Sequence, residues 1–198
     1  MFIELTDHLR CTADHPESFL VLLPDRMTGR RVVAGTLGCP ACGRVVTITE
    51  AAIDFAGEPP APGPTALSAA AIAAFLALEG PGGYLALFGG VGAVAPALTE
   101  LMPGVRLVLI NPPASIADSD EGSVLRAGRS PLKSRSMRGV VVAADHGGDG
   151  PWTDAAIDAL LPGNRAVVEG PRPARAGLEL LAEAAGVWVA RTATTGIR

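Results

Sequence analysis

The sequence predicts an α/β protein in which a small β-rich module precedes a mostly parallel, doubly wound sheet. Three observations predict this fold class. Short β-like runs punctuated by glycine and proline fill the first 56 residues. A proline-rich segment follows them at residues 57–64. Beyond it, apolar runs typical of buried strands alternate with runs typical of helices, which is the pattern of a parallel sheet covered on both faces.

The β-rich module occupies residues 1–56. Turn residues separate its β-like runs, as in a small antiparallel sheet. These runs are Phe19–Leu23, Arg31–Leu37, Val45–Thr49 and Ile53–Phe55. Residues 57–64 (GEPPAPGP) then contain too many prolines to extend a helix or a sheet, so we expect a semi-rigid linker between two domains.

The second domain, residues 65–198, is predicted to alternate helices with buried strands. Helices are expected at Thr65–Glu79, Ala93–Leu101, Thr153–Leu161 and Arg175–Ala185. Thr65 and Ser68 are the candidate caps of the first helix. Strands are expected at Tyr84–Phe88, Arg106–Ile110, Ser123–Ala127, Gly139–Ala144, Asn164–Glu169 and Val187–Ala193.

The composition argues against several function classes. Of 198 residues, 48% are hydrophobic and 18% are charged, so a folded chain is expected. The net charge of -4 argues against nucleic-acid binding driven by bulk charge, and the basic run Arg126–Arg138 is expected to be a solvated loop.

The apolar stretches Thr65–Leu78 and Tyr84–Leu98 are too short, or too broken by glycine and proline, to span a membrane. No secretion signal opens the chain, so a cytoplasmic protein is expected.

Two cysteines in one tight turn predict a metal site. Cys39 and Cys42 lie three positions apart, and Gly43 permits the turn that points backbone N–H groups at the sulfur atoms. The odd total of three cysteines argues against a disulfide framework. A tetrahedral Zn²⁺ site needs two further ligands, and Cys11 and His15 are the natural suppliers.

The fourth ligand and the chemistry of the site leave alternatives open. His8 competes with His15, because His8 and Cys11 are also separated by two residues; we favour His15. A redox Cys-x-x-Cys normally opens a helix, whereas this one precedes the strand-like run 44–48 (RVVTI). Unligated thiols are the remaining alternative. Because a module of 56 residues has a marginal core, we expect structural zinc with four protein ligands and no open position for water.

The first 56 residues resemble the zinc-ribbon family of small activator subunits that bind and stabilise RNA and protein methyltransferases. The resemblance rests on Leu9–Cys11, Gly38–Gly43 and the closing stretch Ile48–Phe55. It implies a structural zinc ion and a protein partner. Family members mostly use four cysteines, so His15 in place of one of them is a departure from the pattern.

Residues 65–193 resemble a class I S-adenosylmethionine-dependent methyltransferase, which has a Rossmann-like fold. The order of helices and strands matches, and Leu160–Arg165 resembles the family's leucine-proline-glycine turn before strand five. The resemblance implies a cofactor pocket at the C-terminal ends of the strands. The residues at its positions are Gly89, Gly90, Gly92, Asn111 and Asp145. By itself, a glycine-rich strand-to-helix turn suits any nucleotide or anion.

The second domain departs from this family at three places. Active relatives carry an acid in the first strand, where this chain has residues 85–88 (LALF). They end the second strand with an acid that binds the ribose hydroxyls, where this chain has Asn111, which lacks the charge-assisted strength of a carboxylate. Only one strand is expected after the fifth, so the closing hairpin is predicted to be incomplete. Together these departures predict weak or absent cofactor binding.

Three further residues near the C-terminal strand ends are weighed as site residues. His146, beside Asp145, is a candidate general base, but the neighbouring glycines favour an exposed and flexible loop. Glu169 is expected to be a solvated loop acid, and Trp152 to pack a helix against the sheet. No residue is therefore assigned a catalytic role.

Three functions follow from these features. We favour a zinc-binding pseudoenzyme with a degenerate methyltransferase-like domain, which acts by binding a protein partner, on which its ribbon docks, or as a scaffold. The alternative is an active S-adenosylmethionine-dependent methyltransferase with a fused activator ribbon, which takes the cofactor as a small-molecule ligand. A nucleic-acid-binding ribbon is least favoured, because nearby acids dilute its basic residues. Those residues are Arg26, Arg30, Arg31 and Arg44.

Overall fold

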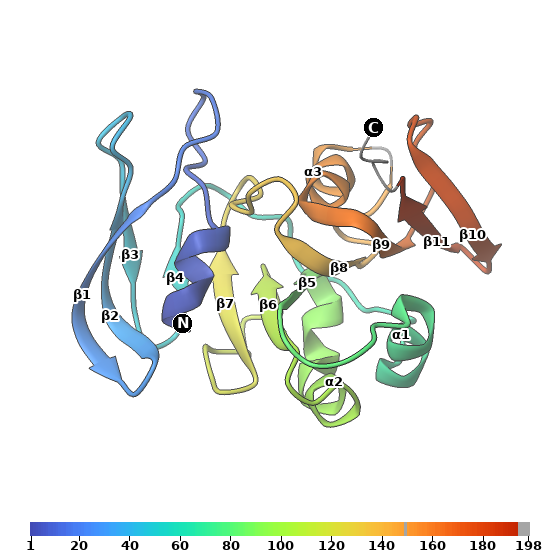
Figure 1. The fold of residues 1–198 in the computed structure, drawn as a ribbon, viewed down its shortest axis with the longest axis horizontal. Helices are drawn as coiled ribbons and strands as arrows, with labels where there is room; N and C mark the ends of the chain where they lie inside the picture. The colour runs from blue at the N-terminus through green and yellow to red at the C-terminus, as the bar shows by residue number, and fades with distance from the viewer. Residues whose placement is uncertain (149, 194–198) are drawn as a thin grey trace.

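The computed structural model describes residues 1–148 and 150–193, so the last five residues of the predicted second domain lie outside the described part. Within the described residues, eleven strands form one continuous sheet in the order β1-β2-β3-β4-β7-β6-β5-β8-β9-β11-β10. β1 lies at one end of the molecule and β10 at the other (Figure 1). The α/β fold class predicted from the sequence is confirmed.

The elements follow the chain in three groups. The first module contains the 3-10 helix η1 (Ile3–His8) and the strands β1 (Val21–Thr28), β2 (Arg31–Gly38), β3 (Val45–Ile48) and β4 (Ile53–Asp54). The parallel centre contains β5 (Tyr84–Phe88), β6 (Arg106–Ile110), β7 (Gly122–Arg126), β8 (Met137–Val142) and β9 (Leu160–Glu169). β10 (Leu178–Ala184) and β11 (Val187–Thr192) form a closing hairpin. The remaining helices are α1 (Ala69–Leu76), the 3-10 helix η2 (Gly89–Val94), α2 (Ala95–Leu101) and α3 (Pro151–Ala159).

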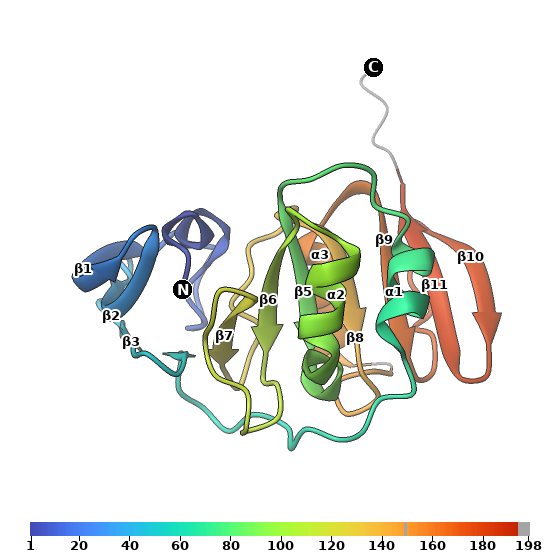
Figure 2. The ribbon, with the colours of Figure 1, turned by 90° about the horizontal axis from the view of Figure 1, so that it is seen from below.

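The central strands are apolar along their whole length because both faces of the sheet are covered. All five residues of β5 are buried. Leu85 and Leu87 belong to a core that includes α1 and α2, whereas Tyr84, Ala86 and Phe88 belong to a core that includes α3 and η1. Figure 2 shows α1 and α2 in front of the sheet and α3 behind it. The alternation of side chains along a strand therefore divides the interior into two layers.

The N-terminal module completes the second of these cores. β4 pairs in parallel with β7, where Ile53 lies opposite Leu125, so the small antiparallel sheet continues into the large one. The connection from β7 to β8 contains no helix, and Leu9 forms a β-bridge to Leu132 within it. Leu5 and Leu9, both fully buried, pack in the same core as Leu125. The first module thus covers a face of the parallel sheet.

The predicted helix at Arg175–Ala185 is wrong, and so is the prediction of an incomplete closing hairpin. The segment Leu178–Ala184 is the strand β10, which pairs antiparallel with β11. A two-residue turn at Ala185 and Gly186, both with positive φ, joins the two strands. Leucine, alanine and glutamate favour a helix locally, but this turn and the pairing of β11 with β9 outweigh that preference.

The first helix of the second domain is shorter than predicted. Of the two candidate caps, Ser68 is the one used: its hydroxyl accepts a hydrogen bond from the N–H of Ala71 at 3.2 Å. Residues 55–68 form a connecting segment without helix or strand, which runs past the carboxyl end of β6 (Figure 2). Among the described residues, no helix combines the length and the apolar character needed to cross a membrane.

Candidate functional site

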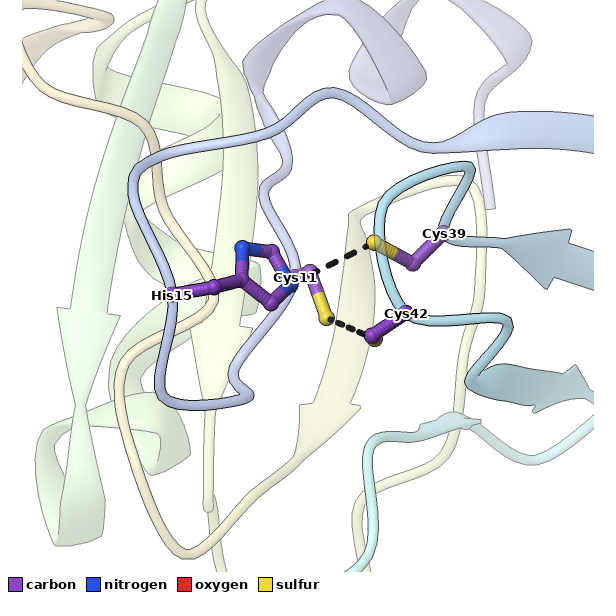
Figure 3. Close-up of side chains that lie close together, drawn as sticks. All are labelled: Cys11, His15, Cys39 and Cys42. Atoms are coloured by element: carbon purple, nitrogen blue, oxygen red, sulfur yellow. Dashed lines mark hydrogen bonds between the residues drawn. The ribbon is translucent and has the colours of Figure 1, made fainter.

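Four side chains of metal-ligating type meet where two loops of the first module face each other. Cys11 and His15 lie on the loop that follows η1, and Cys39 and Cys42 lie on the turn between β2 and β3 (Figure 3). One ligand atom from each residue falls within 4.8 Å of all the others. The structure therefore brings together the four residues that the sequence spacing suggested.

The separations within this cluster fit a tetrahedral zinc ion. The Sγ atoms of Cys11 and Cys42 are 3.8 Å apart, and the Sγ atom of Cys39 is 3.5 Å from Nε2 of His15. Zn–S bonds of about 2.3 Å and Zn–N bonds of about 2.0–2.1 Å at tetrahedral angles give edges of about 3.8 Å and about 3.6 Å. A disulfide requires sulfur atoms about 2.05 Å apart. The donor set and its spacing are thus compatible with a zinc site.

The turn that carries Cys39 stabilises its thiolate, the form that binds a metal. Gly43, with φ +72°, lets the turn close so that its N–H donates to the carbonyl of Cys39 at 2.9 Å. Burial acts to raise the pKa of the Cys39 thiol, but hydrogen bonds from the N–H groups of Cys42 and Ala41 and from neighbouring thiols lower it to about 6. The lowered pKa favours the thiolate of Cys39 over its thiol. Burial of Cys11 raises the pKa of its thiol.

The two histidine candidates occupy different surroundings. The Nδ1 atom of His15 lies 2.7 Å from the carbonyl oxygen of Pro16, to which it can only donate. That bond leaves Nε2 of His15 as the unprotonated nitrogen facing Cys39, the arrangement that a metal ligand requires. The ring of His8 instead packs against Tyr84 with 4.8 Å between ring centroids, and His8 is not part of the cluster.

The second candidate site is the crevice at the carboxyl ends of β5, β6 and β8. The glycine turn after β5 forms η2, and the residues from Gly89 to Gly92 are buried. Gly89 has φ +77°, which favours glycine. A Cβ atom on Gly90 would overlap the carbonyl oxygen of Gly63, and one on Gly92 would lie 2.6 Å from Cβ of Pro112. The chain itself therefore packs directly on this turn.

Asp145 ties the glycine turn to the connecting segment. Its Oδ2 atom accepts hydrogen bonds from the N–H of Gly90 at 2.9 Å and from the N–H of Gly63 at 2.5 Å. Its Oδ1 atom lies 2.9 Å from Nδ1 of His146. Burial acts to raise the pKa of Asp145, but the bonds from His146, Gly63 and Gly90 outweigh burial and lower it. The carboxylate is charged, and both of its oxygens are used within the chain.

Asn111, to which the sequence resemblance assigns the place of a ribose-binding acid, joins two strand ends in the structure. Its Oδ1 atom accepts from the N–H of Ala127, and its Nδ2 atom donates to the carbonyl of Ala127, both at 2.9 Å. Nδ2 also lies 3.1 Å from Nε2 of His146, so that nitrogen accepts and Nδ1 of His146 carries the proton. An aspartate could not donate either bond, which explains why an amide suits this position.

Two residues expected on the surface are buried at this crevice. His146 is 3% exposed, so the prediction of an exposed and flexible loop is wrong. Glu169 is 6% exposed and accepts hydrogen bonds from Thr65 Oγ1, Ala66 N and Ala144 N at 2.9, 2.7 and 3.2 Å. It is therefore not a solvated acid. Glu169 holds loop backbone, whereas His146 joins the side chains of Asp145 and Asn111. Residue type alone does not signal either role.

The groups that the sequence resemblance assigns to an adenosyl cofactor are already hydrogen-bonded within the chain. The N–H of Gly90 donates to Asp145, and the Asn111 amide is 1% exposed and bonded to Ala127. The carbonyl of Gly63 lies against Gly90, where a ligand would approach the turn. Among the described residues, this crevice as folded does not fit the cofactor, because the chain itself occupies its cradle.

No protein-family model matches the chain, and no curated protein matches it. Among solved structures, it is similar to a complex between the Haloferax volcanii Trm112 methyltransferase activator and the putative methyltransferase, at 21% identity and a TM-score of 0.39, covering 48% of this chain and 49% of that chain. It is similar to a geranyl diphosphate methyltransferase in complex with GPP and sinefungin, at 17% identity and a TM-score of 0.42, covering 50% of this chain and 42% of that one. It is also similar to the antibiotic-resistance methyltransferase Kmr, at 16% identity and a TM-score of 0.43, covering 64% of this chain and 93% of that one. The chain thus spans less than half the length of the first two of these proteins.

Proposed function

We propose that this chain is a zinc-stabilised scaffold that acts by binding a protein partner, and that its methyltransferase-like domain does not use S-adenosylmethionine. Residues 1–56 are the zinc ribbon in this proposal, 57–64 the linker and 65–198 the methyltransferase-like domain. The observation that carries the proposal is the hydrogen bonding of Asp145 to both Gly63 and Gly90. To bind here, a cofactor would have to break the hydrogen bond between Gly63 and Asp145 and leave a buried carboxylate short of a donor. The free energy lost in this way exceeds the gain from binding unless the cofactor supplies new hydrogen bonds.

Zinc has a structural role in this proposal. Cys11, His15, Cys39 and Cys42 supply four ligands, which complete a tetrahedron and leave no position for a substrate or a water molecule. When bound, the ion would join the loop after η1 to the turn after β2. Because η1 also packs in the core beneath the parallel sheet, holding this loop stabilises the whole chain.

The outer face of the small sheet supports binding to a protein. Val21 and Leu23 in β1 lie on the same face as Val45 in β3, since Gly38 pairs with both Val21 and Val45. Leu23 is 61% exposed and Val45 62% exposed, and the nearby Phe19 is also exposed. Exposed apolar side chains that gather on one face mark protein-binding surfaces more often than isolated ones do. A partner with a matching apolar surface would cover them.

Calorimetric titration of the zinc-loaded protein with S-adenosylhomocysteine tests the proposal. We expect no saturable heat at micromolar protein and ligand concentrations. Binding at those concentrations, together with methyl transfer from S-adenosylmethionine to an acceptor, would show that the domain is an enzyme and refute the scaffold proposal. A titration with zinc-depleted protein is the control for damage caused by metal loss.

The active methyltransferase remains the second candidate because of the closing hairpin. β10 and β11 complete the order β7-β6-β5-β8-β9-β11-β10, so the sheet is not truncated as the sequence suggested. An enzyme would need the connecting segment to leave Gly90 before the cofactor enters. Faster proteolysis within residues 57–67 on adding S-adenosylmethionine, as the segment leaves the turn, would favour this candidate over the scaffold.

A further inference from the structure

A cavity of about 410 Å³ lies between the first module and α3, apart from the glycine turn. Its walls come from the loop after η1, from the loop after β7 and from the first turn of α3. A volume of this order is within the range that small-molecule sites occupy. Cys11 and His15 line it, so two of the four residues of the Cys/His cluster form part of the cavity wall.

The chemistry of the cavity wall suits an anion. Arg10 and Arg129 both line it, and the Nε atom of Arg10 is buried without a hydrogen-bond partner among residues 1–148 and 150–193. Ser130, which is 5% exposed, also lines it, and its buried hydroxyl has no partner in the same described part of the chain. Buried groups of this kind are normally hydrogen-bonded, and a polar or anionic ligand in the cavity would supply their partners. The exposed carboxylate of Asp14 is the acid in this wall.

Two further features of the wall add to this picture. Pro151 and Trp152, at the start of the nine-residue helix α3, line the cavity, so the positive end of a helix faces it. The half-buried indole of Trp152 supplies a flat apolar surface, with its ring centroid 4.9 Å from that of His146. A second hollow shares Arg129 with the cavity and adds the base Arg44 and the acid Glu58.

We propose that this cavity binds a nucleotide, with the phosphate held by Arg10 and Arg129 and the base packed against Trp152. Guanidinium groups bind phosphate through paired charge-assisted hydrogen bonds, and an indole offers any base a stacking surface. The cavity is distinct from the crevice closed by Asp145, and the inference does not depend on the proposed function.

Fluorescence of Trp152 tests this site directly. The chain has two tryptophans, and Trp188 is fully buried with an indole N–H that has no hydrogen-bond partner within the described residues, so Trp188→Phe loses none of the hydrogen bonds described. In that background we expect guanosine 5′-monophosphate to change the fluorescence saturably. Guanosine should bind about tenfold more weakly, because it lacks the charged group that the arginines bind. Inorganic phosphate should compete with the nucleotide.

Matched arginine variants locate the site. Arg129→Gln should weaken binding of guanosine 5′-monophosphate about tenfold, and Arg129→Lys should restore part of the affinity. Arg172→Gln makes the same charge change at an ion pair with Glu183 and should leave the affinity unchanged. Absence of a saturable signal in a folded protein, or equal losses from Arg129→Gln and Arg172→Gln, would overturn the proposal.

Two added ligands separate this proposal from the scaffold function. S-adenosylhomocysteine that binds without displacing guanosine 5′-monophosphate would refute the scaffold function and leave the nucleotide site intact. Displacement would place the nucleotide in the glycine crevice and overturn the inference. A short RNA with a 5′-phosphate then distinguishes a free nucleotide from an RNA end: tighter binding than the mononucleotide assigns the site to the RNA end, and weaker binding assigns it to a free nucleotide.

Discussion

The carboxylate of Asp145 and the backbone N–H of Gly63 are joined by a hydrogen bond of 2.5 Å across 82 positions of the chain. The same oxygen atom accepts from Gly90 in the glycine turn. One side chain therefore fixes the connecting segment onto the turn that a nucleotide-type fold offers to its ligand. The crevice is closed by backbone and side-chain atoms of the protein, and this closure can be tested by substitutions on either side of it.

Gly90→Ala should dislodge the connecting segment. The added Cβ would overlap the carbonyl oxygen of Gly63, so the segment must move or the turn must distort. We expect a loss of about 1–3 kcal/mol in the free energy of unfolding and faster proteolysis within residues 57–67. Gly38→Ala is the control, since its Cβ would have an ordinary contact at 4.0 Å. Unchanged proteolysis in Gly90→Ala would argue against the closed crevice.

Asp145→Asn should destabilise the protein by about 1–3 kcal/mol at neutral pH, because an amide cannot accept all three bonds. The folded-state pKa of Asp145 is lowered, so its carboxylate contributes stability above the unfolded pKa of about 3.9. That stability disappears as the pH falls through the folded-state pKa. The difference in melting temperature between the two proteins should therefore be constant from neutral pH down to about pH 4 and shrink below it.

Asp25→Asn is the control for that comparison, because Asp25 is exposed on β1 and its change should alter stability by less than about 0.5 kcal/mol. A difference between wild type and Asp145→Asn that vanishes already near pH 6 would show that Asp145 is not held as a charged acceptor. Thermal unfolding followed by circular dichroism at a series of pH values provides the measurement.

Strand and turn patterns in the sequence predicted much of the fold. The buried runs Tyr84–Phe88 and Arg106–Ile110 are strands with the predicted ends, since apolar residues bounded by glycine and proline leave few alternatives. The strand at Leu178–Ala184 was missed because its leucines, alanines and glutamates favour a helix. Its pairing with β11, which itself pairs with β9, decides against a helix. Local composition cannot report that pairing.

The metal cluster was easier to predict than the crevice. Cys39 and Cys42 lie only three positions apart in the chain, a spacing typical of paired metal ligands. Asp145, by contrast, meets Gly63 only because the connecting segment crosses the strand ends, which no local pattern indicates. The burial of Glu169 has the same origin, since the segment that covers it precedes it by about a hundred positions.

Asn111→Asp, which restores the acid of the resembling family, should cost stability and gain no cofactor binding. The carboxylate would face the carbonyl of Ala127 and the accepting nitrogen of His146 without a proton to donate. We expect a loss of about 1–3 kcal/mol in the free energy of unfolding and no heat of S-adenosylhomocysteine binding. Asn164→Asp in β9 is the matched control for the charge change. Micromolar binding by Asn111→Asp would show that the missing acid, rather than the closed crevice, decides cofactor use.

Zinc content should follow His15 and not His8. We expect about one zinc ion per chain in the wild type and in His8→Ala, and well below half of that in His15→Ala. His15→Cys should retain the metal, because a fourth thiolate completes the same tetrahedron. Equal zinc contents in His8→Ala and His15→Ala would contradict the ligand assignment. Acidification should release the ion as protons displace it from the thiolates, including Cys39, whose metal-free pKa is about 6.

Leu9→Ala should destabilise the first module and the parallel sheet together. Leu9 is fully buried in the core that contains Phe88 and Leu125, so removing three carbon atoms leaves a cavity shared by both parts. We expect a loss of about 2–5 kcal/mol in the free energy of unfolding, whereas Phe19→Ala, at a side chain 57% exposed, should change it by less than about 0.5 kcal/mol. Tryptophan fluorescence, to which Trp188 in β11 contributes, and zinc release from the first module should report one coincident transition. If zinc release precedes the fluorescence change by a wide margin in Leu9→Ala and in the wild type, the two parts unfold independently, and the first module is an attachment rather than a component of the core.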